Sequence, residues 1–180
     1  IDDNDTYYGK VKDQLLQGKD IGADVSCPTE WMAARWVNNG YVQKLNADNI
    51  PNKSNLAPAY LGASFDPNRD YTMPYQGILA GITYNKEAYK AATGKDAPTK
   101  LEDLRDPALK GRVGVLSEMR DTIGLMLMAE GIDIGDPNSL TQDAFMNAID
   151  FFRGKVEDGQ IARIKGNSYS EDLNNGDTIA

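Results

Sequence analysis

Two carboxylates lie three residues apart in the stretch Leu116-Ser117-Glu118-Met119-Arg120-Asp121. A short apolar run precedes Glu118, and Arg120 stands between the two acids. We expect a strand to end at Leu116 and Asp121 to cap the helix that follows, so that both carboxylates lie at one strand-to-helix turn. Such a pair can hold a cation, can work as an acid/base pair, or can merely complement the positive end of a helix dipole.

A second turn, Cys27-Pro28-Thr29-Glu30-Trp31, places a hydroxyl and an aromatic ring at the start of another helix. It follows a predicted strand over 23–27, and open α/β sheets bind ligands at the carboxyl ends of their strands. Thr29 and Trp31 are therefore candidates for ligand contact. The structural alternative is a helix cap beside a packed tryptophan, with Cys27 as a small buried apolar residue.

The composition excludes several classes of site. The 180 residues include no histidine and one cysteine, which removes Ser-His-Asp and Cys-His catalysis, His-ligated metals and disulfide frameworks. We therefore expect no metal and no cofactor. The net charge of −8 argues against nucleic acid and anionic membranes as partners and is compatible with a cationic ligand.

Helical periodicity and short apolar runs alternate along the chain, which predicts α/β sheets flanked by helices. Asn85 and Thr141 are further predicted caps, and in the helix after Thr141 we expect an inward face of Phe145, Ile149, Phe152 and Val156. The predicted helices cover 6–17, 30–39, 86–93, 123–130 and 142–158. The predicted strands cover 23–27, 113–116 and 160–164.

The segment Phe65–Asn85 predicts the passage between two lobes. A turn at Asp66 leads into an aromatic strand over 71–75, a glycine-rich crossing over 76–81, and a second strand ending before Asn85. A chain that leaves one sheet and enters another in this way suits a hinge. We therefore expect residues 1–79 to form part of one lobe and residues 80–180 most of a second.

Phe65–Asn85 and Lys110–Asp121 resemble the periplasmic solute-binding proteins of ABC importers, specifically the spermidine/putrescine-binding branch. The resemblance runs from the first helix to about Asp177. It implies an α/β, two-lobed periplasmic-binding-protein-like (type II) fold that is incomplete at both ends. The implied activity is solute binding without turnover, with the solute enclosed when the hinge closes.

The resemblance also assigns roles to residues. Thr29 and Trp31 match the hydroxyl residue and the aromatic that the family places against its ligand, and Glu118 and Asp121 match its two amine-binding carboxylates. Tyr75 is the crossover tyrosine and a further predicted ligand contact.

One departure from the family pattern follows Tyr75. Many family members carry Trp-Gly two residues after this tyrosine, where this chain has Gly77-Ile78. An aromatic wall of the family's site is thus missing here.

The implied partners are a small cationic ligand, foremost a polyamine, and the membrane permease of an ABC importer, with a monomeric full-length protein. The implied location is periplasmic or anchored at the cell surface, although no export signal opens the chain. Two alternatives stay open. One is a receptor for another solute, such as an opine, a sugar or a ferric chelate; the other is a hydrolase that uses Glu118 and Asp121 as an acid/base pair.

Overall fold

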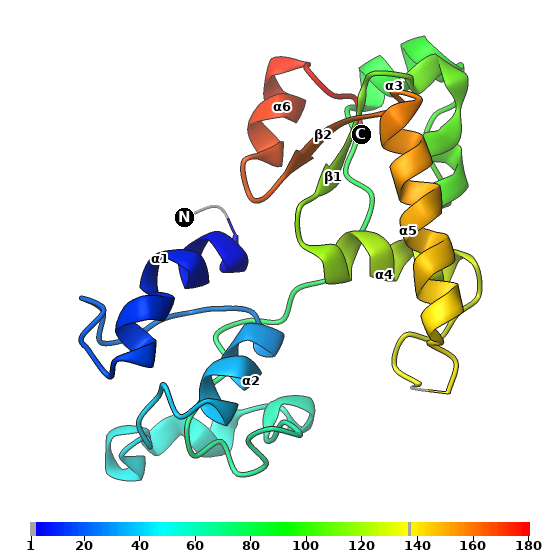
Figure 1. The fold of residues 1–180 in the computed structure, drawn as a ribbon. Helices are drawn as coiled ribbons and strands as arrows, with labels where there is room; N and C mark the ends of the chain where they lie inside the picture. Colours follow the sequence, from blue (N-terminus) through cyan, green and yellow to red (C-terminus); the bar gives the residue numbers. More distant parts are fainter. Residues whose placement is uncertain (1–2, 137) are drawn as a thin grey trace. The chain divides into compact units, whose positions relative to one another are not determined.

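The computed structural model describes residues 3–136 and 138–180 (Figure 1). These residues form two compact units, Asp3–Ile78 and Leu79–Ala180. We call them unit 1 and unit 2 and describe each by itself.

Unit 1 is built on two helices, α1 (Asn4–Leu16) and α2 (Glu30–Asn38). The carboxylate of Asp3 caps α1 by accepting from the backbone N–H of Thr6 at 2.7 Å. The helix therefore begins at Asn4, two residues before the start that the sequence predicts. Thr29 precedes the first residue of α2, as predicted.

The core of unit 1 lies between these helices. Val11 of α1 and Met32 and Trp36 of α2 are buried there, and the ring centres of Tyr7 and Trp36 lie 5.8 Å apart. Aromatic and aliphatic side chains from both helices and the following turn surround this centre.

The predicted strand over 23–27 is not formed. Ala23, Asp24 and Val25 are exposed, and so is Cys27, which was expected to be buried. Within the described residues no neighbouring strand pairs with this segment, and an isolated extended segment has no ladder of hydrogen bonds to hold it.

Three short 3₁₀ turns follow along a long connection: η1 (Ala47–Asn49), η2 (Pro51–Asn55) and η3 (Pro58–Tyr60). The chain then passes through the Asp66 loop, residues 66–72, in which Asp66 and Arg69 are both buried. Because buried charges need hydrogen-bond partners, the bonds of these two side chains hold the loop in one conformation within an otherwise irregular region.

The segments 71–75 and 81–84 are not regular strands, so this prediction was wrong, and no hairpin joins them in the described chain. The chain between them is exposed, with Ile78 at 73% and Leu79 at 98% of full accessibility. The division between units 1 and 2 falls at these two residues.

Unit 2 contains a parallel pair of strands, β1 (Val113–Leu116) and β2 (Ile161–Lys165), joined through helices α4 (Met119–Ala129) and α5 (Gln142–Glu157) (Figure 1). The segment 178–180 lies along the other edge of β1. Ile179 donates its N–H to the carbonyl of Arg112 at 2.7 Å and accepts from Asn85 at 2.9 Å, which extends the hydrogen-bonded layer beyond β1.

The remaining helices of unit 2 are α3 (Lys86–Thr93) and α6 (Tyr169–Asn175), with 3₁₀ turns η4 (Leu101–Arg105) and η5 (Pro107–Leu109). Asn85 caps α3 as predicted, and Gly94 ends it in the left-handed conformation.

Two apolar clusters hold unit 2 together. One joins α3 to the sheet around Tyr89, Leu109, Val113 and Ile179, and the other joins α4 to α5. Phe145, Ile149 and Phe152 face the second cluster as predicted. Val156 does not, since at the last turn of α5 it is 37% exposed.

Candidate functional site

The two predicted carboxylates flank the first turn of α4, but their roles differ from the prediction. Glu118, not Asp121, is the cap: its carboxylate accepts from the N–H of Arg120 at 3.3 Å. The helix therefore begins at Met119, and Asp121 lies within its first turn. Met119 and Arg120 favour helix, so the helix extends back to the earlier acid.

The environment of the pair is partly withdrawn from solvent. The side chain of Glu118 is only 15% exposed, and a guanidinium nitrogen of Arg120 lies 3.8 Å from its carboxylate. Burial, and secondly the neighbouring Glu118 carboxylate, raise the pKa of Asp121 above its ordinary value of 3.8. Two acids thus lie at one helix N-terminus, and the anionic form of Asp121 is disfavoured. An added cation would be stabilising at this turn.

An apolar cavity of about 130 Å³ adjoins this turn. It is lined by Leu116, Ser117, Met119, Thr122, Ile123, Ile149, Phe152 and Ile164. Ser117 and Met119 are the neighbours of Glu118 in the chain, so the carboxylate turn and the cavity share a wall.

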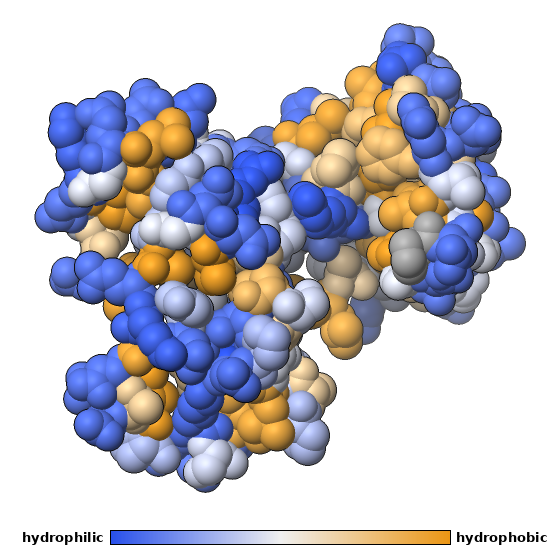
Figure 2. All heavy atoms as spheres, turned by 60° about the horizontal axis from the view of Figure 1, so that its bottom comes forward, coloured by the Kyte–Doolittle hydropathy of each residue, from blue (hydrophilic) through white to orange (hydrophobic). Residues whose placement is uncertain are grey.

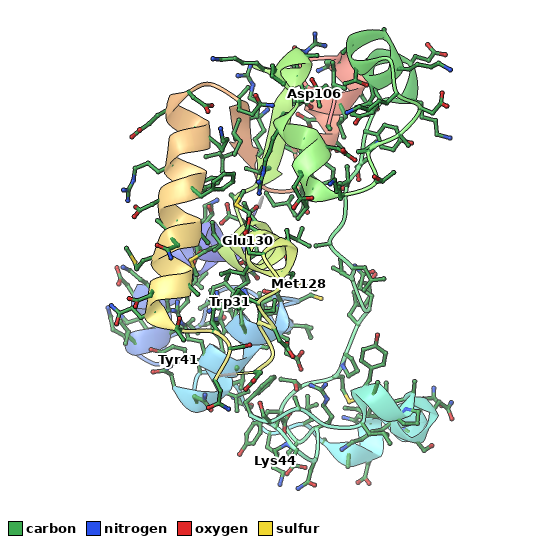
Figure 3. The ribbon with its side chains drawn as sticks, turned by 90° about the vertical axis from the view of Figure 1, so that its right-hand side faces the viewer. Trp31, Tyr41, Lys44, Asp106, Met128 and Glu130 are labelled. Atoms are coloured by element: carbon green, nitrogen blue, oxygen red, sulfur yellow. The ribbon has the colours of Figure 1, made fainter. Side chains whose placement is uncertain are left out.

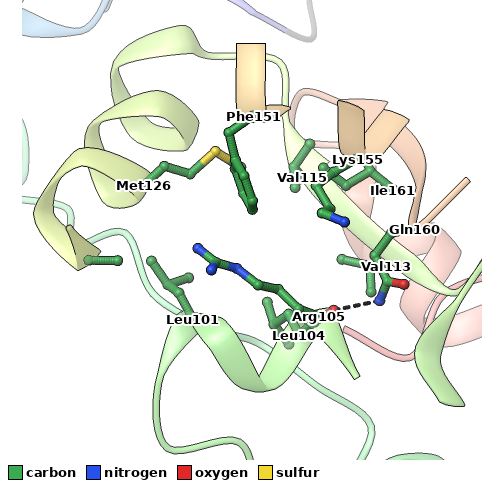
Figure 4. A pocket seen from close by; sticks show the side chains of 11 residues that line it. Leu101, Leu104, Arg105, Val113, Val115, Met126, Phe151, Lys155, Gln160 and Ile161 are labelled. Atoms are coloured by element: carbon green, nitrogen blue, oxygen red, sulfur yellow. Dashed lines mark hydrogen bonds between the residues drawn. The ribbon is translucent and has the colours of Figure 1, made fainter. Parts of the chain in front are cut away.

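A second cavity of unit 2, of about 60 Å³, is lined largely by apolar side chains of η4, β1, α4 and α5 (Figure 4). The Arg105 guanidinium carbon lies 4.4 Å from the ring centre of Phe151, and Gln160 donates to the carbonyl of Leu104 at 2.7 Å. Neither Glu118 nor Asp121 lines this cavity, so it does not contain the predicted carboxylates.

In unit 1, the side chain of Asn4 holds Thr29 through two hydrogen bonds. Its amide nitrogen donates to the Thr29 hydroxyl oxygen at 2.8 Å, and its carbonyl accepts the Thr29 N–H at 3.0 Å. The predicted ligand residue Thr29 is thus fixed to the first residue of α1. This partner could not be predicted from the sequence, because Asn4 lies 25 positions away from Thr29.

Trp31 lies one residue into α2 and is half-buried against the core of unit 1 (Figure 3). The guanidinium carbon of Arg35, one helical turn later, lies 5.4 Å from the centre of the indole ring. The predicted aromatic ligand contact therefore faces a cation of the protein itself, the Arg35 guanidinium, a contact that was not predicted from the sequence.

Tyr75 is 80% exposed in the chain segment that leaves unit 1. Two residues later, a Cβ atom at position 77 would collide with the hydroxyl of Tyr60. Because residue 77 is a glycine, the side chain of Tyr60 in η3 can occupy this space.

The Asp66 loop connects this segment to the start of α2. The Asp66 carboxylate accepts from the N–H groups of Asp70, Tyr71 and Thr72 at 2.8–3.0 Å. Burial alone would raise the pKa of Asp66, but these hydrogen bonds and one from the Thr72 hydroxyl lower it.

Arg69 completes the connection. It donates to the carbonyl of Tyr60 at 3.1 Å, and its guanidinium lies 3.7 Å from the carboxylate of Glu30, which neighbours both Thr29 and Trp31.

Across residues 3–136 and 138–180, no group of three His, Cys, Asp or Glu side chains is placed to bind a metal ion. In the same part of the chain, every helix is too short or too polar to cross a membrane.

Residues 2–180 match the model of one family, described as bacterial extracellular solute-binding protein. The chain belongs to this family. Among curated proteins it is 25% identical to spermidine/putrescine-binding periplasmic protein 1 of Haemophilus influenzae, over 89% of this chain and 48% of the relative. It is 29% identical to the putrescine-binding periplasmic protein PotF of Escherichia coli, over 98% of this chain and 48% of the relative.

Solved structures agree in fold. A Listeria monocytogenes protein described as a spermidine/putrescine ABC transporter matches all of this chain and 52% of its own, with a TM-score of 0.75 and 24% identity. The substrate-binding protein PotD of Streptococcus pneumoniae matches 99% of this chain and 51% of its own, with a TM-score of 0.66 and 21% identity. The predicted α/β periplasmic-binding-protein-like fold is confirmed, and the chain spans about half the length of each of these four proteins.

Proposed function

We propose that the intact protein is the extracytoplasmic receptor of an ABC importer, and that its solute is a small organic cation, foremost a polyamine. The observation that carries the proposal is the turn at α4, where Glu118 and Asp121 lie together with the Asp121 pKa raised. An alkylammonium group would relieve this repulsion. Relatives that are named for spermidine and putrescine binding support the same class of solute.

In this proposal Glu118 and Asp121 hold ammonium groups, while Thr29, Trp31 and Tyr75 contribute a hydroxyl and aromatic faces for the rest of the solute. Aromatic faces attract both the methylene chain and the cationic heads of a polyamine. Units 1 and 2 correspond to parts of the two lobes, with residues 76–81 as the hinge. The protein binds its solute without chemical turnover and presents it to a membrane permease.

Calorimetry on the intact protein tests this function. The panel contains putrescine and spermidine, a neutral sugar and a dicarboxylate. We expect Glu118→Gln and Asp121→Asn each to weaken putrescine binding at least 30-fold, since loss of one partner of a desolvated charge pair costs about 2–5 kcal/mol.

Asp143→Asn is the matched control, because Asp143 is an exposed acid in the first turn of α5. Equal binding by wild type and both site variants, or preference for the sugar or dicarboxylate, would contradict a cation receptor. Product formation that disappears in Glu118→Gln would instead identify a hydrolase.

A further inference from the structure

Two aromatic rings from different helices face one cation in unit 1. The guanidinium carbon of Arg35 lies 5.2 Å from the ring centre of Tyr8 and 5.4 Å from that of Trp31. Tyr8 belongs to α1 and Trp31 to α2. Both distances are within the range of about 6 Å over which an aromatic ring attracts a cation. We call the Tyr8 and Trp31 rings the aromatic pair.

The two rings of the aromatic pair are held by packing, whereas the Arg35 side chain between them is not. Both rings pack against the buried core of unit 1, which is formed by Val11, Met32 and Trp36. Arg35 is exposed, and in the described part of the chain it forms no ion pair with a carboxylate. The guanidinium can therefore rotate into solvent while both rings stay in place.

We propose that the aromatic pair is a subsite for a cationic head of the solute, and that Arg35 is an internal competitor that fills it when no solute is bound. This inference rests on the proposed function, because it makes the Trp31 ring a contact of an alkylammonium group. A primary or secondary ammonium suits the same two ring faces, since the attraction depends on charge and distance. The solute must then displace Arg35, so the protein's own cation sets the affinity.

The test is putrescine binding by the intact protein with Arg35→Gln, which removes the charge and keeps most of the side-chain length. One exposed cation–π contact corresponds to about two- to fivefold in affinity, and Arg35 gives up two of them. We expect putrescine to bind about tenfold more tightly. Arg35→Lys keeps a cation in the pair and should reverse most of this gain.

Two controls separate competition from a general change in charge. Arg153→Gln removes an equal charge from an exposed site on α5 and should not give the gain. In a Tyr8→Leu background, Arg35→Gln should also lose its effect, because the subsite needs both rings. Weaker binding by Arg35→Gln, or the same gain without Tyr8, would overturn the proposal and make Arg35 a brace between two helices.

A second readout is independent of the natural solute. The indole N–H resonance of Trp31, assigned with Trp31→Phe, is followed by NMR while butylammonium is added. It should shift at lower butylammonium concentration in Arg35→Gln than in wild type, and not in Tyr8→Leu. This shift without putrescine binding in any variant would refute the polyamine assignment alone; no shift in Arg35→Gln would refute the subsite.

Discussion

At Asp121, the proposed solute contact, we expect solute charge and proton binding to be coupled. Its pKa is raised by burial and by Glu118, so between pH 3.8 and that raised pKa the native protein holds a proton that the unfolded chain has released. Ionised Asp121 therefore lowers the stability of the empty protein as pH rises through this window. In the proposed site, a bound cation would favour ionised Asp121 and so offset this loss of stability.

We predict that putrescine affinity rises with pH through the window just above pH 3.8 and then levels off. Asp121→Asn should flatten this rise, because the titrating group is gone. Calorimetry across about pH 4 to pH 7 measures it. The same slope in Asp121→Asn would assign the proton to another group.

Asp66 titrates in the opposite sense. Its pKa is lowered, so its contribution to stability is complete above pH 3.8 and is lost as pH falls through the native pKa. We predict that Asp66→Asn lowers the stability of unit 1 at pH 7 by about 2 kcal/mol, because an amide cannot accept all of the loop's hydrogen bonds.

The acid-dependent part of the melting curve below about pH 4 should also shrink in this variant. Thermal melts at several pH values give both quantities. Asp48→Asn, an exposed acid of η1, is the control and should change stability by less than about 0.5 kcal/mol. An unchanged melting temperature in Asp66→Asn would show that the loop is held by other contacts.

At the scale of elements, a single side chain, that of Asn85, caps the N-terminus of α3. The Asn85 side chain accepts from the N–H of Ala88 at 3.0 Å. We predict that Asn85→Ala costs about 1 kcal/mol and that Asn85→Ser restores most of it. Chemical denaturation and hydrogen exchange of the α3 backbone amides both measure this loss of stability. Equal stability of wild type and both variants would contradict the prediction.

Helices were predictable from this sequence where a single residue offers the cap. Asn85 and Thr141 were identified because each is the one short polar side chain before an apolar periodic run. The start of α4 was misplaced because Glu118 and Asp121 both suit the position, and only packing decides between them. The candidate carboxylates were still correctly placed at one turn.

The strands were less predictable, because a strand exists only through a partner distant in sequence. The segments 23–27 and 71–75 have strand composition, yet neither is paired within the described residues. β1, in contrast, is bordered by β2 on one edge and by Ile179 on the other, about 50 or more residues away. The contacts of Asn4 with Thr29 and of Tyr8 with Arg35 escaped prediction for the same reason.

At the scale of the molecule, apolar side chains reach the surface among the hydrophilic ones (Figure 2), and the boundary between the units is an exposed example. Tyr75, Ile78 and Leu79 are accessible to a protease there. We predict that chymotrypsin cuts the native protein first between residues 75 and 80, and that putrescine slows this cut if hinge closure accompanies binding.

Mass spectrometry of the first fragments identifies the cut. First cleavage within residues 47–64 would show that the backbone there is more accessible than that of residues 75–80, and would contradict the prediction. A cut at 75–80 whose rate is unaffected by saturating putrescine would contradict closure while leaving the division into units intact.

The contact between Tyr60 and Gly77 has a consequence for how this protein can change over generations. Because the tyrosine hydroxyl fills the space of any side chain at position 77, gaining an aromatic there requires Tyr60 to shift or to be replaced by a smaller residue first. The order of substitutions then matters: the same pair of changes is accessible by one path and obstructed on the other. A library that varies one position at a time will find that no side chain is tolerated at position 77. Joint variation of positions 60 and 77 can instead yield sequences that carry an aromatic residue at position 77.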